Sequence, residues 1–241
     1  PRFASGGNVN MEAEMALNKD QEMDYTKNLL YNNSNVGAIN ENDYTAYAYS
    51  ENDYFKKMRE KAIADEQKRV QKAFDKKHEA KPNQVILVSE YGAESDLALN
   101  TEMPTRLDNT GQYQRYFHES YLKQIKERPY FAGTAIWNQF DFGNPNIGGT
   151  ISNINHKGMF TWDRKPKDVY YLYKANWNPE PLVYIATRDW SHRAGSVNDS
   201  STIEVYSNAP EVTLFVNGKN YGSKKVDAIK KAIWKVKLSE S

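Results

Sequence analysis

The chain contains no cysteine among its 241 residues. This absence excludes disulfide bonds, thiolate metal sites and cysteine nucleophiles. It is equally compatible with a cytoplasmic protein and with a bacterial periplasmic one. Cysteine usage therefore limits the chemistry of the protein but not its compartment.

The chain also lacks an excess of charge of either sign, with 32 Lys and Arg against 31 Asp and Glu. Nucleic-acid binders usually carry a basic excess clustered on one face, so we expect no nucleic-acid partner. The charged segment 51–81 mixes both signs and is typical of a solvated helix face. No apolar run approaches the roughly 18 residues of a membrane span, so we expect no membrane partner either.

Aromatic residues are abundant instead, with 17 Tyr and 5 Trp. Tyr and Trp combine an apolar ring with a polar group, and sugars likewise combine C–H faces with hydroxyl edges. The composition is compatible with a carbohydrate-binding protein and also with an ordinary core rich in aromatic residues.

Strand and helix patterns alternate over residues 1–175, which predicts parallel βα units, and we expect the first domain to cover residues 1–177. A continuous apolar run at 84–88 predicts a strand that is buried on both faces. The other expected elements are strands at 36–39 and 131–137, and helices at 51–80, after the N-cap signal at 108–110, and at 166–175 with Pro166 in the first turn.

The pattern changes after residue 177, and residues 178–241 are expected to form a second domain. Alternating strands are expected at 183–185, 203–206, 212–216 and 232–236, with a hairpin signal at Asn217-Gly218. This pattern is typical of an immunoglobulin-like β-sandwich. Such a domain usually has about 100 residues and seven strands, so we expect an incomplete one.

Two residues at the ends of the expected strands are candidates for a site. Glu90 follows the apolar run 84–88, and Trp137 ends the next strand. Catalytic groups of parallel barrels lie at the carboxyl ends of the strands, and an aromatic ring beside a carboxylate suits a pyranose. The alternatives are a structural carboxylate and a tryptophan at the edge of the core.

Four segments resemble glycoside hydrolases of family 2, the β-galactosidase/β-glucuronidase family. The segment Val88–Ala93 (VSEYGA) resembles the strand that carries their nucleophile, and Gly133–Phe142 (GTAIWNQFDF) resembles their final barrel strand. The segment Asn155–Asp168 resembles the region that closes their barrel, and Asn208–Lys219 resembles the β-sandwich that follows it. The resemblance implies the second half of a (β/α)8 TIM barrel followed by an immunoglobulin-like β-sandwich.

The resemblance implies a retaining exo-acting hydrolase with Glu90 as nucleophile and Trp137 lining the sugar site. It also implies a tyrosine that hydrogen-bonds the nucleophile, for which Tyr44 is our first choice and Tyr47 the second. We expect a β-galactosidase-like enzyme, with a β-glucuronidase as the alternative. From another class, a non-catalytic carbohydrate-binding or scaffold remnant is a third possibility.

The same resemblance sets the expected partners and compartment. We expect a carbohydrate substrate, no cofactor and no metal site, since the four histidines at 78, 118, 156 and 192 lie in different elements. We expect His118 to be structural. The family allows a homo-oligomer of the full-length enzyme, and we favour a bacterial periplasmic or extracellular location over the cytoplasm.

The acid/base partner of Glu90 is harder to place. Family 2 enzymes carry it in an Asn-Glu pair, but Asn40-Glu41 lies too few residues before Glu90 to occupy that strand. The opening segment 1–8 resembles the region just after the acid/base strand, so we expect that residue upstream of Pro1. We accordingly expect the isolated chain neither to fold stably nor to hydrolyse glycosides.

Asn155 and Lys157 form an Asn-x-Lys pattern that contacts the substrate carboxylate in β-glucuronidases. Relatives named β-galactosidases carry a similar pattern. Two interpretations stay open for this pair: a contact to the sugar, or a structural role in closing the barrel.

Overall fold

A computed structural model of the chain describes residues 61, 64, 68, 71–102, 104–106, 108–146, 153–190 and 200–237. All of them belong to one of two compact units, Lys56–Ser241. The predictions for strand 36–39, Glu41, Tyr44 and Tyr47 lie outside the described residues. Within the part that is described, no helix is long and apolar enough to cross a membrane.

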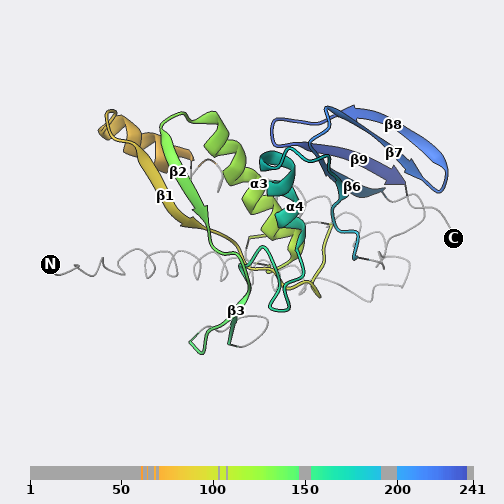
Figure 1. Ribbon diagram of the computed structural model, residues 1–241, viewed down its shortest axis with the longest axis horizontal. Helices are drawn as coiled ribbons and strands as arrows, with labels where there is room; N and C mark the ends of the chain where they lie inside the picture. Colours follow the sequence, from red (N-terminus) through yellow and green to blue (C-terminus); the bar gives the residue numbers. More distant parts are fainter. Residues whose placement is uncertain are drawn as a thin grey trace, which may run out of the picture. The chain divides into compact units, whose positions relative to one another are not determined.

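A parallel pair of strands and a connecting helix form the first part of the fold (Figure 1). Strand β1 (Ile86–Tyr91) pairs with β2 (Phe131–Ile136) in parallel. Helix α3 (Gly111–Glu127) connects them, and the Thr110 side chain accepts the backbone N–H of Tyr113 as its N-cap. This is the expected βαβ pattern, with the cap inside the expected segment 108–110.

Strand β1 differs from its prediction in two respects. It extends to Tyr91, so Glu90 lies within the last residues of the strand and not after it. The strand also has one covered face: Val88 packs against the helical core, whereas Leu87 is 69% exposed, and Val85, just before the strand, is 74% exposed. The inner face of a barrel strand is buried by the other strands of the barrel, and only β1 and β2 of such a sheet lie among the described residues.

Helix α4 (Asp168–Trp177) begins two residues later than predicted. Pro166 forms an isolated bridge with Phe160, and the N–H of Lys167 donates to the carbonyl of Met159 at 2.9 Å. These contacts hold residues 166 and 167 in an extended segment, so the helix begins only after them. The helix ends at Trp177, where we expected the first domain to end, but the division at this residue stays a prediction.

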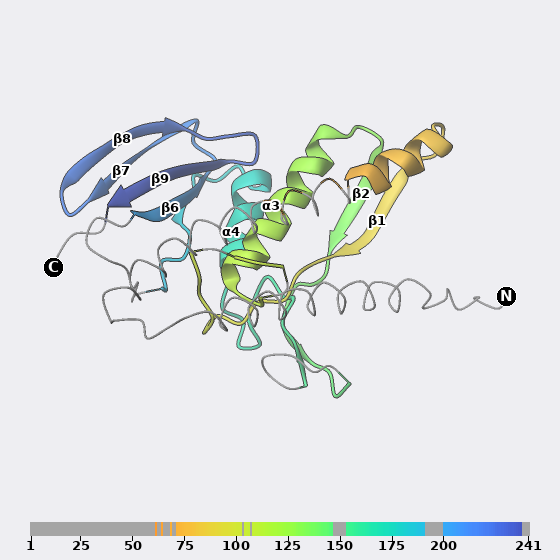
Figure 2. The same ribbon diagram turned by 180° about the vertical axis from the view of Figure 1, so that it is seen from behind.

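A β-rich part follows α4 (Figure 2). Strands β5 (Val183–Ile185), β6 (Ser200–Ser207) and β9 (Lys231–Lys237) form an antiparallel sheet. Strands β7 (Glu211–Val216) and β8 (Lys219–Lys225) form a hairpin, whose turn residues Asn217 and Gly218 have φ of 50° and 76°. Those angles match the two-residue turn predicted there. Strand β8 was not predicted, because its sequence KNYGSKK has little apolar content.

Two hydrophobic clusters hold these elements. One joins α3 and α4 to the start of the β-rich part, and its fully buried members include Val169, Leu172 and Tyr206. The other lies within the β-rich part around Trp234 and Leu214. Tyr206 on β6 thus packs with residues of α3 and α4, so the first cluster spans both parts and the second does not.

Buried charges also join the two parts. Arg115 of α3 forms ion pairs with Glu204 of β6 and, at 3.3 Å, with Asp168 of α4. Lys231 of β9 forms ion pairs with Glu119 of α3 at 2.7 Å and with Glu204 at 2.5 Å. Each charge has an opposite partner, as buried charges require.

Candidate active site

Glu90 and Trp137 lie at adjacent strand ends. Tyr91 is in register with Ile136, and the N–H of Trp137 donates to the carbonyl of Tyr91 at 2.8 Å. Glu90 is exposed, and Trp137 is 41% exposed. The peptide bond between Trp137 and Asn138 is cis. The structure therefore brings together the predicted nucleophile and the predicted sugar-binding tryptophan.

Gly92 is what allows the two strand ends to approach each other. A Cβ atom at this residue would lie 1.8 Å from the backbone carbonyl oxygen of Trp137. No side chain can occupy that space without moving one of the two backbones. The glycine of the SEYG segment therefore has a steric role next to the site.

The side chain of Tyr91 anchors the end of β1 in the helical layer. Its hydroxyl hydrogen-bonds the hydroxyl of Tyr173 at 2.9 Å, and that hydroxyl hydrogen-bonds Nδ1 of His118 at 2.8 Å. Its ring stacks on Tyr121. A register shift between Val88 and Tyr91 interrupts the alternation of side chains at this end of the strand, so both residues contact the helical core while Glu90 between them is exposed.

His118 is fully buried, in agreement with its predicted structural role. Burial, and then the nearby Lys167, lower the pKa of His118 to about 3. The imidazole is therefore neutral at physiological pH, and it completes the hydrogen-bonded chain behind β1 without carrying charge.

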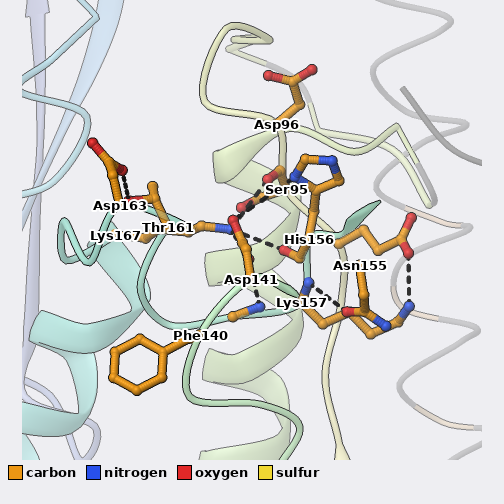
Figure 3. Close-up of polar contacts among 12 residues, drawn as sticks. Ser95, Asp96, Phe140, Asp141, Asn155, His156, Lys157, Thr161, Asp163 and Lys167 are labelled. Carbon is orange, nitrogen blue, oxygen red and sulfur yellow. Dashed lines mark hydrogen bonds and ion pairs between the residues drawn. The ribbon is translucent and has the colours of Figure 1, made fainter. Parts of the chain in front are cut away.

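The predicted pair Asn155 and Lys157 lies in the segment between β2 and α4 (Figure 3). Strand β4 (Ile154–Asn155) pairs antiparallel with β3 (Phe142–Gly143), and the N–H of Asn138 donates to the carbonyl of Lys157 at 3.2 Å. Asn155 is buried, and its Oδ1 accepts the N–H of Lys157 at 3.1 Å. The Asn155 oxygen is thus hydrogen-bonded within its own segment, whereas the Lys157 side chain is 30% exposed.

The ammonium group of Lys157 forms an ion pair with Glu94. The distance from Nζ to Oε1 is 2.8 Å, and the Glu94 side chain is 19% exposed. Glu94 was not predicted as a site residue. It lies four residues after Glu90 in an irregular loop, where the sequence gives no sign of which cation it meets.

A buried lysine lies behind this loop (Figure 3). Lys167 Nζ donates to Asp141 Oδ1 at 2.9 Å and to the carbonyls of His156 and Ser95 at 2.9 and 3.3 Å. Asp141 also accepts the N–H of Gly158 at 2.9 Å. One lysine thus ties together the three segments that follow β1, follow β2 and precede α4.

Burial shifts the pKa values of this pair in opposite directions. It raises the pKa of Asp141, against the attraction of Lys167, and it lowers the pKa of Lys167, against the attraction of Asp141. Both groups were missed as site residues, although each lies in a segment that carries the family resemblance. Their pairing could not be seen in the sequence because 26 positions separate them.

The histidines within the described residues do not converge. His78 stacks on Tyr130, His118 bonds Tyr173, and His156 lies 3.8 Å from Asp141. His192 lies outside the described residues. Among the residues that are described, no group of three or more His, Asp or Glu side chains is arranged to hold a metal ion.

Comparison with known proteins extends these observations. The chain is 38% identical over 174 residues to a β-glucuronidase of Bacteroides fragilis, a match that covers 68% of this chain and 25% of that protein. It is 33% identical over 123 residues to the β-galactosidase BoGH2A of Bacteroides ovatus, covering 50% of this chain and 14% of that protein. The chain thus spans about a quarter or less of the length of these relatives.

Solved structures resemble the fold as well. An FMN-binding β-glucuronidase from Faecalibacterium prausnitzii matches with a TM-score of 0.67 and 34% identity, over 72% of this chain and 27% of that one. A Bacteroides uniformis β-glucuronidase 2, covalently bound to cyclophellitol-6-carboxylate aziridine, matches with the same TM-score and identity, over 72% and 21%.

Family models assign both parts of the chain. Residues 198–240 match a domain of unknown function, DUF4982. Residues 7–180 match the TIM barrel domain of the glycosyl hydrolases of family 2. The predicted order of a barrel segment followed by a β-rich region is confirmed, and the chain belongs to glycoside hydrolase family 2.

Proposed function

We propose that the enzyme containing this chain is a retaining β-glucuronidase in which Glu90 is the nucleophile. Names of relatives support the choice of sugar: the Bacteroides fragilis protein and both solved structures above are described as β-glucuronidases. This reverses the order of our two sequence-based interpretations, in which a β-galactosidase came first.

The observation that carries the proposal is the place of Lys157. Its Cβ lies 3.7 Å from the position that a Cβ would take on Gly92. Its carbonyl accepts a hydrogen bond from the N–H of Asn138, the residue after Trp137. A partly exposed cation therefore lies beside both strand ends. A uronic acid offers it a carboxylate for a charge-assisted hydrogen bond, whereas galactose offers only a hydroxyl.

The proposed reaction is a double displacement. Glu90 attacks the anomeric carbon as the glycosidic C–O bond breaks, while an acid about 5–5.5 Å from Glu90 protonates the leaving oxygen. Water then hydrolyses the glycosyl ester, giving its proton to the same group and restoring Glu90. Trp137 offers its exposed ring to the apolar face of the sugar.

Substitution of Glu90 in the complete enzyme tests the role of nucleophile. Glu90→Gln should lower kcat on an aryl β-glucuronide by about 10³-fold or more. In Glu90→Gly, added azide should restore turnover and give the α-glycosyl azide, because azide then attacks from the side that Glu90 occupied. Hydrolysis that survives in Glu90→Gln would refute the assignment and favour a non-catalytic role for this carboxylate.

Substitution of Lys157 tests the sugar. Lys157→Met should lower kcat/KM for the aryl β-glucuronide by about tenfold or more, since a hydrogen bond to a charged group is lost, and leave the aryl β-galactoside almost unchanged. Lys165→Met is the matched control, because Lys165 is 77% exposed in the same connection. Equal losses on both sugars would refute the carboxylate contact.

A β-galactosidase is the second candidate. It is supported by the similarity to the β-galactosidase BoGH2A of Bacteroides ovatus. A wild-type enzyme that cleaves the aryl β-galactoside with higher kcat/KM than the glucuronide would decide for this candidate.

A further inference from the structure

We propose that Glu94 is a positioning residue that orients Lys157 and thereby sets the preference for an anionic sugar. This inference rests on the proposed function, because it requires that Lys157 bind the carboxylate of the substrate. Glu94 does not touch the sugar in this proposal and acts only through the lysine.

The backbone of Lys157 is fixed, but its side chain needs an orienting partner. Its carbonyl accepts the N–H of Asn138, and its own N–H donates to Asn155. Beyond Cβ the lysine is a flexible stem with a point charge at its end. Within the described residues the only ion pair of this ammonium is with Glu94. That contact therefore determines where the charge lies.

Glu94 is itself held on a rigid base. The side-chain amide of Gln114 donates to the carbonyl of Ala93 at 3.0 Å, and its Oε1 accepts the hydroxyl of Ser95 at 2.9 Å. The N–H of Ser95 donates to the carbonyl of His156 at 3.2 Å, which ties this loop to the segment that carries Lys157. Both residues flanking Glu94 are thus fixed by buried helix α3 and by the neighbouring loop.

The Glu94–Lys157 pair is less exposed to solvent than an ordinary surface ion pair. The side chains of Glu94 and Lys157 are 19% and 30% exposed, whereas the Lys165–Asp163 pair, at the same 2.8 Å, is 77% and 56% exposed. Reduced solvent screening strengthens the attraction between partly buried charges. The Glu94 pair can therefore orient the lysine, and the exposed pair serves as its natural comparison.

The hydrogen-bonding capacity of lysine allows both partners at once. An ammonium group carries three N–H donors, and Glu94 Oε1 accepts one of them. Among the described residues no other acceptor is bonded to this ammonium, so two donors can bind a uronate carboxylate while Glu94 keeps its place. A neutral sugar gains little from this arrangement, so Glu94 favours the anionic substrate without contacting it.

The test compares Glu94→Gln, Glu94→Asp, Lys157→Met and the double variant Glu94→Gln/Lys157→Met in the complete enzyme. Glu94→Gln keeps the shape of the side chain but loses its charge. Its kcat/KM for an aryl β-glucuronide should fall about tenfold, mainly through KM, with the aryl β-galactoside changed less than about twofold. Glu94→Asp should recover part of the loss. In the Lys157→Met background, Glu94→Gln should have no further effect.

Each alternative outcome has a separate meaning. If Glu94→Gln lowers activity equally with and without Lys157, or equally on both sugars, Glu94 acts as a general structural residue and the inference is wrong, while the proposed function stands. If Lys157→Met leaves the glucuronide preference intact, the proposed carboxylate contact fails first, and the role of Glu94 fails with it. The melting temperature of each variant identifies a loss that comes from unfolding.

Discussion

Lys167 and Asp141 form an ion pair of 2.9 Å in which the two side chains are only 1% and 5% exposed. The same ammonium also donates to two backbone carbonyls, from the segments after β1 and before α4. The buried ammonium of Lys167 therefore holds the two loops that carry Glu94 and Lys157, so the geometry of the candidate site depends on this lysine.

We predict that Lys167→Met destabilises the barrel by about 3–5 kcal/mol. The reason is that removing one partner leaves the Asp141 carboxylate buried without its counter-charge. Chemical denaturation of the complete enzyme at pH 7 measures the change. Lys165→Met is the control, since the exposed pair Lys165–Asp163 should contribute about 1 kcal/mol or less. Similar losses for the two variants would contradict the role assigned to Lys167.

Gly92 gives a second prediction, on activity. Gly92→Ala places a Cβ where the carbonyl oxygen of Trp137 now lies, at 1.8 Å, so the strand ends must separate. A displacement of about 1 Å at a catalytic site can cost about 10²-fold in rate, and we expect a loss of kcat of at least that size.

The matched control is Gly111→Ala, at the first residue of α3. A Cβ there would meet only a leucine methyl group, at 4.0 Å. Activity of the Gly111 variant should equal that of the wild type. If Gly92→Ala were also fully active, the close approach of the two strand ends would be wrong.

The junction between α3 and the β-rich part gives a prediction on pH. Burial by itself would raise the pKa of Glu204, but Arg115 and Lys231 more than offset it and lower that pKa from 4.5 to about 2. A carboxyl whose pKa is lower in the folded state contributes stability above its unfolded pKa and loses it as pH falls through the folded one. The contribution of Glu204 should therefore be complete above about pH 4.5 and decline toward pH 2.

Glu204→Gln isolates this contribution. At pH 7 the variant should be less stable than the wild type by on the order of 3 kcal/mol, because both Arg115 and Lys231 lose a charged partner. The difference should shrink as the pH of the denaturation experiment is lowered from 4.5 to 2.5. A difference that is independent of pH would show that the charge of Glu204 does not stabilise the junction.

The sequence predicted those structural features that depend on residues close together in the chain. The N-cap at Thr110, the turn at Asn217-Gly218 and the strand-end places of Glu90 and Trp137 all depend on neighbours within a few positions. The observed helix and strand boundaries differ from the predicted ones by only a few residues, as at the start of α4. There the bridge of Pro166 to Phe160 decides the boundary, and Phe160 lies outside the helix pattern.

Contacts between distant segments could not be predicted in this way. Glu94 and Lys157 are 63 positions apart, and Arg115 and Glu204 are 89 apart. Acidic and basic residues are so frequent in this chain that charge alone does not select a partner. Exposure of Leu87 was missed for a related reason: an apolar run shows that a strand can be covered on both faces, but not which elements cover it.

The hydrogen-bonded chain behind β1 gives a last prediction, on the precision of the site. Tyr91→Phe removes the hydroxyl that bonds Tyr173 at 2.9 Å and leaves the Tyr173–His118 contact in place. A buried hydrogen bond contributes about 1 kcal/mol, so we expect a loss of that size in stability. Because the tyrosine next to Glu90 is then less firmly held, kcat should fall several-fold with KM unchanged.

Tyr171→Phe is the control, since the Tyr171 ring stacks on Tyr184 and its hydroxyl makes no hydrogen bond among the described residues. Both effects should be absent in that variant. If the two variants had the same kcat, Tyr91 would stabilise the fold without positioning Glu90.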